Sequence, residues 1–239
     1  MKGAGLIIGA SVGSIGAQVW SDANVDRRLQ EVMWYRPPIE DLNVLNPTGL
    51  EGWLLKAGLM DNPRADFEGF DYVVYAAGVN KLRWLNDMTF DHMREHFEVN
   101  VSGMVMLLSR IKTLWPEKVF SAVALTSDAA RNPMRTSVAY CSSKAAQEMA
   151  IRVMAREWTG WRINGVAPAV VAHTNMSNSI DAQIGAVRGW TREEAAAYER
   201  TQLPLGRRVT KAEVSQVVRD VLTGPAYQTG SIVNISGGK

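Results

Sequence analysis

Six short apolar runs alternate with longer stretches of helical periodicity, and this alternation constrains the fold of the chain more than any other feature. The apolar runs are residues 6–8, 32–35, 72–76, 119–125, 162–167 and 231–235. The clearest helical patterns are residues 89–114, 137–158 and 211–222. Strands that alternate with helices predict βαβ units, in which a parallel sheet carries helices on both faces. We therefore expect an α/β fold with a doubly wound, Rossmann-like parallel sheet.

The length of the chain, 239 residues, suits one domain of this kind. No internal repeat, low-complexity tract or Pro/Gly/Ser linker divides the sequence, so we expect a single domain over all 239 residues. Residues 21–71 are the hardest to interpret, because Pro37 and Pro38 interrupt their short apolar runs. Residues 41–44 suggest a further strand and residues 47–56 a short helix. That arrangement leaves too little chain for a full crossover helix between the second and third strands.

Charge and cysteine content exclude several classes of partner. The formal net charge is +2, and acidic and basic residues are interspersed without a long basic block. Nucleic acid and an anionic membrane surface are therefore not expected as partners. No stretch approaches the roughly 20 apolar residues of a membrane span. The single cysteine, Cys141, cannot form an internal disulfide and fits a reducing compartment. We expect a soluble, cytoplasmic protein.

Histidines are the remaining candidates for a metal site. His92 and His96 lie four residues apart on an expected helix, and His173 is distant in sequence. No third ligand accompanies the pair, so no metal site is predicted.

Tyr140 and Lys144 are the most informative pair for function. Their spacing of four residues in a helical segment places the phenol and the ammonium on one helix face, one turn apart. A free phenol has a pKa near ~10 and is a poor acid–base catalyst at neutral pH. A fixed ammonium beside it favours the phenolate and lowers that pKa toward the working range.

A glycine-rich turn follows the first apolar run. Gly9, Gly13 and Gly16 stand between that run and an expected helix. Backbone N–H groups and the helix dipole at such a turn hold a pyrophosphate, and glycines let the phosphates approach closely. The alternative is a plain strand-to-helix turn. The position of the turn at the start of a βαβ pattern favours a dinucleotide site.

These features, with Ser127 in a small-residue run thirteen positions before Tyr140, resemble the short-chain dehydrogenase/reductase family. The resemblance covers most of the chain and is weakest over residues 21–71. The chain departs from the family's Thr-Gly-x-x-x-Gly-x-Gly motif at Ile8, which replaces the threonine, and by one extra residue between the second and third glycines. Tyr75 replaces an asparagine that lines the adenosine side in the family.

The resemblance implies four catalytic residues. Tyr140 would exchange a proton with the substrate oxygen, and Ser127 would hydrogen-bond and orient the same oxygen. Lys144 would hold the nicotinamide ribose and bias Tyr140 toward ionisation. Asn100 would link Lys144 to a proton-relaying water chain. Hydride would pass directly between nicotinamide and substrate carbon, so the protein would supply positioning and electrostatics.

The resemblance also implies the cofactor site. Arg36, near the end of the second strand, suits the 2′-phosphate of NADP, which we favour over NAD; the alternative is a solvated surface arginine. Thr174 would meet the nicotinamide carboxamide. The predicted cofactor-binding residues are Gly9, Ser11, Gly13, Ser14, Ile15, Arg36, Ala76, Ala77, Gly78, Tyr140, Lys144, Pro168 and Thr174.

On the substrate side, the resemblance implies a mobile lid at about residues 174–204 that excludes water before hydride transfer. Its large apolar residues are Met176, Ile180, Ile184, Trp190 and Tyr198. They suit either an apolar substrate face or the core of a two-helix insert. Arg131 and Arg135 would meet an anionic substrate tail or be solvated.

The predicted function is that of an NAD(P)-dependent oxidoreductase acting on a carbonyl or a secondary alcohol, similar to a 3-oxoacyl-thioester reductase or a related ketone reductase. The family also suggests a homotetramer or homodimer, with the helices at 89–114 and 137–158 at the interface. A sugar-nucleotide epimerase would need a larger C-terminal domain than this length allows. The alternative from another class is a non-catalytic, dinucleotide-sensing binding protein on the same fold.

Overall fold

The computed structural model describes residues 4–9, 14–26, 29, 33–35 and 69–239. Three predicted cofactor residues, Ser11, Gly13 and Arg36, lie outside these described residues. The strand and the short helix expected at 41–44 and 47–56 lie outside them as well.

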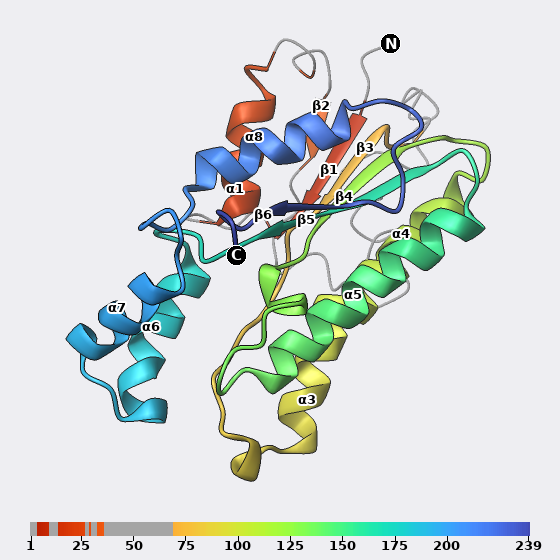
Figure 1. Cartoon of the computed structure of the whole chain (residues 1–239). Helices are drawn as coiled ribbons and strands as arrows, with labels where there is room; N and C mark the ends of the chain where they lie inside the picture. Colours follow the sequence, from red (N-terminus) through yellow and green to blue (C-terminus); the bar gives the residue numbers. More distant parts are fainter. Residues whose placement is uncertain (1–3, 10–13, 27–28, 30–32, 36–68) are drawn as a thin grey trace.

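The described residues contain one six-stranded sheet, in the order β2-β1-β3-β4-β5-β6, with every neighbouring pair parallel (Figure 1). The strands are β1 Ala4–Ile8, β2 Met33–Tyr35, β3 Tyr72–Tyr75, β4 Ser121–Leu125, β5 Arg162–Pro168 and β6 Ile232–Ile235. Each strand coincides with one of the six apolar runs, so the predicted doubly wound parallel sheet is confirmed. The order changes direction between β1 and β3, which is where open α/β sheets bind their ligands.

Helices cover both faces of the sheet (Figure 1). The helices on one face are α1 Ile15–Ala23 and α8 Lys211–Leu222, and those on the other are α3 Phe90–Phe97, α4 Gly103–Leu114 and α5 Val138–Glu157. Strand side chains alternate between the two cores, with Leu6 and Ile8 in one and Ile7 in the other. This alternation follows from the two-residue period of a strand, and the burial on both faces explains why the strands read as continuous apolar runs.

The helix predicted over residues 89–114 is divided in two. A π-helical turn, Glu98–Ser102, separates α3 from α4. The buried Tyr75 hydroxyl donates a 2.6 Å hydrogen bond to the carbonyl oxygen of Val99 within this turn. A π turn interrupts the regular i to i−4 ladder, so an external donor compensates one of its carbonyls. Tyr75 therefore makes a polar contact of its own at the position where the family has asparagine.

Two further helices, α6 Asn175–Arg188 and α7 Arg192–Thr201, form a pair that stands apart from both layers (Figure 1). Each begins with a capping box, at Thr174 and Thr191, in which the cap hydroxyl and the third helical residue satisfy each other's backbone N–H groups. Gly189 ends α6 in the left-handed conformation, with a φ of 70°. Within the described part of the chain, no helix combines the length and the apolar character needed to cross a bilayer.

Candidate active site

A cavity of about 760 Å³ opens at the carboxyl ends of the central strands. The last residues of β1, β4 and β5, which are Ile8, Leu125 and Pro168, all line it. This edge of a doubly wound sheet is where the fold places its ligands. The cavity is bounded by the sheet and by the pair α6 and α7.

The predicted cofactor residues that the structure describes all line this one cavity. They are Gly9, Ser14, Ile15, Ala76, Ala77, Gly78, Tyr140, Lys144, Pro168 and Thr174. These residues come from five separate parts of the sequence, and the fold brings them together.

In the turn after β1, the backbone lies very close to the segment that follows β3. Gly9 has a φ of +82°, and a Cβ there would lie 2.4 Å from the backbone nitrogen of Ala77, so only glycine fits. Ser14 caps helix α1: its hydroxyl oxygen accepts a 3.1 Å hydrogen bond from the Ala17 N–H and donates to the Gly9 carbonyl at 3.0 Å. The N-terminus of α1 therefore faces the cavity, and its orientation suits an anionic group such as a phosphate.

Tyr140 and Ser127 meet at the other end of the cavity. Both are buried, and the Ser127 side chain hydrogen-bonds the Tyr140 phenol. The Ser127 oxygen also accepts a 3.2 Å hydrogen bond from the Ala129 N–H, which fixes its position at the start of a 3₁₀ turn, Asp128–Ala130. Two hydroxyls from different elements thus converge on one spot, as a site that binds a carbonyl oxygen requires.

The expected effect of Lys144 on Tyr140 is not observed. Burial raises the pKa of Tyr140 to about 12, although the hydrogen bond from Ser127 opposes this shift. The Lys144 ammonium lies 5.8 Å from the centre of the phenol ring, and it donates instead to the Leu125 carbonyl and to Gln147 Oε1, each at 2.8 Å. Desolvation sets the direction of this shift and Lys144 is not among its causes, so the structure does not support the prediction that this ammonium lowers the phenol pKa.

Lys144 is itself strongly perturbed. Burial lowers its pKa from 10.5 to about 7, and the nearby Glu148 carboxylate opposes the shift. Gln147, which is fully buried, supplies one of the two acceptors. Sequence reasoning missed Gln147, although its position three residues after Lys144 puts it on the same helix face.

Asn100 lies beside the cavity without lining it. Its amide oxygen accepts from the Val79 N–H at 2.9 Å, and its amide nitrogen donates to Val79 O and to the Ser143 hydroxyl. These bonds let Asn100 hold the segment after β3 in place, and Lys144 donates to Leu125 and Gln147 instead. A Cβ on Gly78 would lie 3.3 Å from Asn100 Oδ1 and 3.6 Å from Lys144 Nζ. A side chain at this position would crowd both groups, so glycine suits this part of the cavity wall.

Two charged residues at the site were not predicted. Asp128 follows Ser127 directly, is 4% exposed and lines the cavity. Its Oδ2 lies 3.2 Å from the Lys239 ammonium, which also lines the cavity. Asp128 could have been predicted from the sequence, because it is an acidic residue within the small-residue run around Ser127. No sequence signal indicates its contact with Lys239, because the two residues are far apart in the chain.

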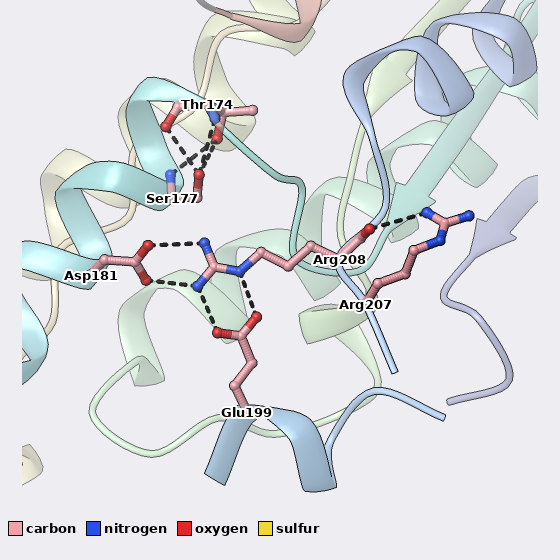
Figure 2. Close-up of polar contacts among 6 residues, drawn as sticks. All are labelled: Thr174, Ser177, Asp181, Glu199, Arg207 and Arg208. Atoms are coloured by element: carbon pink, nitrogen blue, oxygen red, sulfur yellow. Dashed lines mark hydrogen bonds and ion pairs between the residues drawn. The ribbon is translucent and has the colours of Figure 1, made fainter. Parts of the chain in front are cut away.

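The pair α6 and α7 forms the outer wall of the cavity. Its apolar residues Met176, Ile180, Ile184, Trp190 and Tyr198 all line the cavity. Trp190 and Tyr198 also pack against each other, with ring centroids 5.0 Å apart, so these side chains both line the cavity and join the two helices. Thr174 also lines the cavity, while its hydroxyl oxygen accepts a 3.0 Å hydrogen bond from the Ser177 N–H as the cap of α6 (Figure 2).

One arginine fastens the two helices of this wall. Figure 2 shows Arg208 between Asp181 of α6 and Glu199 of α7, with four hydrogen bonds of 2.5 to 2.9 Å. These bonds raise the pKa of Arg208 above its usual range. The neighbouring Arg207 binds Glu213 instead, at 2.6 and 2.9 Å, and does not line the cavity. Adjacent arginines therefore serve different parts of the molecule.

The two arginines between Ser127 and Tyr140 differ in role. Arg131 forms two hydrogen bonds to the buried Glu148, at 2.7 and 2.8 Å, and a third to Asn234. Arg131 therefore joins the sheet to α5, and its guanidinium has a structural role. Arg135 is exposed and lines the mouth of the cavity. Among the residues that the structure describes, no group of three His, Cys, Asp or Glu side chains could hold a metal ion.

Fold and site together define a dinucleotide-binding α/β protein with a tyrosine–serine pair in its ligand cavity. A family model described as "Enoyl-(Acyl carrier protein) reductase" matches residues 57–239, which is most of the chain. The chain belongs to the short-chain dehydrogenase/reductase family, as the sequence predicted. This is a family of NAD(P)-dependent oxidoreductases.

Two curated relatives illustrate the sequence similarity. L-xylulose reductase of Caenorhabditis elegans is 28% identical over 70% of this chain and 64% of its own length. D-erythrulose reductase of Gallus gallus is 26% identical over 99% of this chain and 91% of its own length. The match to the first relative thus leaves about a third of that protein uncovered.

Two solved structures illustrate the shared fold. A short-chain dehydrogenase family protein from Francisella tularensis subsp. tularensis SCHU S4 superimposes with a TM-score of 0.82 at 19% identity, over 100% of this chain and 98% of that one. A small-chain dehydrogenase in complex with NADPH gives a TM-score of 0.76 at 17% identity, over the same shares of the two chains.

Proposed function

We propose that this protein is an NAD(P)-dependent oxidoreductase that transfers hydride between nicotinamide and a carbonyl or secondary alcohol carbon. The observation that carries the proposal is the convergence of Ser127, Tyr140 and Lys144 on the cavity that also contains the N-terminus of α1. A protein that only stores or senses the dinucleotide has no need of two buried hydroxyls beside it.

The side chains divide the work of carbonyl reduction. Ser127 and Tyr140 hold the substrate oxygen between them, and Tyr140 gives that oxygen its proton as the carbonyl becomes an alcohol. Burial raises the pKa of Tyr140, so the phenol carries the proton that reduction requires, although a raised pKa also makes it a weaker acid. The bound nicotinamide cofactor supplies the hydride. Lys144, which lines the cavity together with Gly78, would hold the ribose hydroxyls.

NADP remains our preferred cofactor. The preference depends on Arg36, whose guanidinium suits a 2′-phosphate. The complex of a structural neighbour with NADPH supports it. A comparison of NADPH and NADH affinities in wild type and Arg36→Ala tests it: the variant should lose NADPH affinity and keep NADH affinity.

The relatives favour a small hydroxylated ketone as substrate. L-xylulose reductase and D-erythrulose reductase are each named for a ketose, in which hydroxyl groups stand next to the carbonyl. The cavity offers polar groups near Ser127 and an apolar outer wall, which suits a short substrate of mixed polarity. Reduction of a 3-oxoacyl thioester remains the other prediction, and Arg135 at the mouth of the cavity would then meet the anionic carrier.

Assembly and location remain predictions as well. Exposed apolar side chains on α4 and α5, namely Met106, Met149 and Val153, support a homodimer or homotetramer through these helices. Size-exclusion chromatography with light scattering tests this assembly. We retain the cytoplasm as the expected location.

The decisive experiment is a fluorescence titration with NADPH and NADH, followed by a panel of carbonyl substrates. The panel contains ketoses, hydroxy ketones, 3-oxoacyl thioesters, ketosteroids and quinones, together with an enoyl thioester because of the description of the family model. Oxidation of NADPH with one ketone class supports the proposal. Tight cofactor binding without turnover of any substrate would favour the dinucleotide-sensing alternative instead.

A further inference from the structure

Arg188, the last residue of α6, lines the cavity with a guanidinium that is only partly used by the protein. Its Nε donates a 3.0 Å hydrogen bond to the Thr136 hydroxyl, and its Nη2 donates a 2.6 Å hydrogen bond to the Arg135 carbonyl oxygen. Its Nη1 donates to no acceptor among the described residues and, unlike the unpaired Nε of Arg162, is not enclosed by protein. The donors of Nη1 are therefore open to a ligand.

The loop that receives Arg188 has an unusual backbone. Thr136 is buried and has a φ of 62°, a left-handed conformation that threonine seldom adopts. In this conformation its hydroxyl donates to the Arg135 carbonyl oxygen at 2.5 Å and accepts the Nε of Arg188. The ring of Trp190, whose centroid lies 5.2 Å from Arg188 Cζ, adds a further contact. The guanidinium is thus held in one orientation before a ligand binds, which lowers the entropic cost of binding.

The charges around the cavity leave this guanidinium without an acid. The acidic side chains that line the cavity already have cationic partners: Asp128 pairs with Lys239, and Asp181 and Glu199 both pair with Arg208. Arg188 and Arg135 line the cavity as well, and neither forms an ion pair with any residue that the structure describes. Burial lowers the pKa of Arg188, and the charge of Arg135 adds to this shift. Two neighbouring cations of this kind are stabilised by an anion.

The position of Arg188 places this anion on the substrate side of the cavity. Its hydrogen-bond partners, Arg135 and Thr136, belong to the loop that leads from Ser127 to Tyr140. In the proposed function, Ser127 and Tyr140 bind the reacting oxygen of the substrate. The turn after β1, where the phosphates of the dinucleotide are expected, belongs to a different part of the cavity wall. The free donors of Arg188 therefore suit a group on the substrate.

We propose that Arg188 binds a carboxylate or phosphate at the end of the substrate remote from the reacting carbonyl, with Arg135 as a second cation, so that the site selects anionic ketones over neutral ones. This inference rests on the proposed oxidoreductase function and adds the charge of the substrate. It is compatible with a hydroxylated ketone, which would carry the anionic group at its far end. The planar donors of a guanidinium match the oxygens of carboxylate and phosphate.

The first test compares keto acids with their methyl esters, which keep the carbonyl and lose the charge. Pyruvate, acetoacetate and levulinate place the carboxylate at increasing distances from the ketone. Wild type should prefer at least one acid over its ester by about tenfold or more in kcat/KM. Arg188→Ala should lower this ratio by about 10- to 100-fold, because hydrogen bonds between two charged groups are lost.

Two further variants separate the charge of Arg188 from its role in packing. Arg188→Lys keeps the charge without the planar donors and should lower the ratio less than Arg188→Ala. Arg192→Ala, at an exposed arginine outside the cavity, is the matched control and should keep the wild-type ratio. An equal loss of rate with acid and ester in Arg188→Ala would overturn the inference, since Arg188 would then only shape the wall.

A second pair of ketones identifies the anion. Dihydroxyacetone phosphate and dihydroxyacetone differ only in the phosphate. A preference for the phosphorylated ketose that Arg188→Ala removes would support the inference with phosphate as the anion. A preference confined to the keto acids would support it with carboxylate.

A binding measurement separates this inference from the proposed function. Ligand-observed NMR compares each anion with its neutral counterpart and needs no turnover. If no ketone were turned over, but wild type bound an anion more tightly than its counterpart and Arg188→Ala abolished that difference, the role of Arg188 would stand while the oxidoreductase proposal fell. If wild type showed no preference for the anion of any pair, in rate or in binding, the inference would be overturned, whether or not the ketones were reduced.

Discussion

The two walls of the cavity are held in place by different forces. The wall beside the sheet, which we call the sheet wall, consists of Ser127 after β4 and of Tyr140 and Lys144 on α5. These side chains are buried and form hydrogen bonds within the core. The lid wall, which consists of α6 and α7, is fastened by partly exposed ion pairs of Arg208. Loss of a buried hydrogen-bond partner costs about 1–3 kcal/mol, whereas exposed ion pairs contribute about 0–1 kcal/mol.

This difference assigns the walls to different tasks. A rigid wall keeps reacting groups within the narrow geometric limits that catalysis requires. We propose that the wall of α6 and α7, held by weaker and partly solvated contacts, opens at low cost to admit and release substrate. Changes in the sheet wall should therefore act on the chemical step, and changes in the lid wall on substrate access. The predictions below test this division, from the largest expected effect to the smallest.

Tyr140→Phe should have the largest effect. Loss of the proton donor should lower kcat/KM by about 10²- to 10⁴-fold, while NADPH affinity, measured by fluorescence titration, changes only a few-fold. Tyr227→Phe, at a fully exposed tyrosine, is the matched control. If NADPH binding fell as steeply as turnover, Tyr140 would be holding the cofactor site together and would have no separate role in the chemistry.

Lys144 should make stability depend on pH. Its pKa is about 7 in the folded protein against 10.5 ordinarily, so between these values the unfolded chain binds a proton that the folded chain lacks. The free energy of unfolding should therefore rise with pH from 7 to 10.5, and the contribution of Lys144 should become independent of pH below 7, where both states are protonated. In wild type this rise should amount to on the order of 1–3 kcal/mol between pH 7 and 9. Urea unfolding of Lys144→Met should show no such rise.

The exposed Lys81 provides the control for this measurement, since Lys81→Met should keep the wild-type pH dependence. Parallel curves for wild type and Lys144→Met would show that the burial of Lys144 does not perturb its titration. That result would weaken the contrast between a desolvated sheet wall and a solvated lid wall.

Gln147→Leu sharpens the account of the sheet wall. The substitution removes one of the two acceptors that hold the Lys144 ammonium, and it should lower kcat/KM by about tenfold. The pH profile of kcat/KM should shift as well, because loss of an acceptor for the charged form lowers the pKa of Lys144 further. Gln147→Glu keeps an acceptor and should raise that pKa. Profiles unchanged in both variants would mean that Gln147 only fills space.

Arg208→Ala should have the smallest effect on chemistry. It removes the hydrogen bonds to Asp181 and Glu199 that join α6 to α7, and KM should rise by about threefold to tenfold with a smaller change in kcat. Arg207→Ala is the matched control, since its neighbouring guanidinium pairs with Glu213 away from the cavity. A larger loss in kcat than in KM would contradict the assignment of the lid wall to substrate access.

Much of the fold could be predicted because its signals are local. All six strands coincide with apolar runs, and α8 spans the residues 211–222 that the periodicity indicated. The break between α3 and α4 could not be predicted, because residues 98–102 carry no helix-breaking glycine or proline. The turn is compensated by Tyr75, which is more than twenty residues distant in sequence. Tertiary contacts override local propensity at such places.

The candidate site shows the same limit. Family spacing was sufficient to locate Ser127, Tyr140 and Lys144, which the structure places on one cavity. It did not indicate how the Lys144 ammonium is directed, because its acceptor Leu125 comes from another element of the fold. The contact between Asp128 and Lys239 joins residues that no motif connects.

The π-helical turn Glu98–Ser102 also determines the directions in which the side chains of α3 and α4 point about the helix axis. Buried residues on both sides of it recur at intervals of four: His92, His96, Asn100, Met104 and Leu108. In an ordinary α-helix this interval drifts by about 40° per step, which would carry the stripe nearly to the opposite side. The wider turn takes back part of that drift, so the number of residues in it, and not only their identity, decides whether Asn100 reaches Val79.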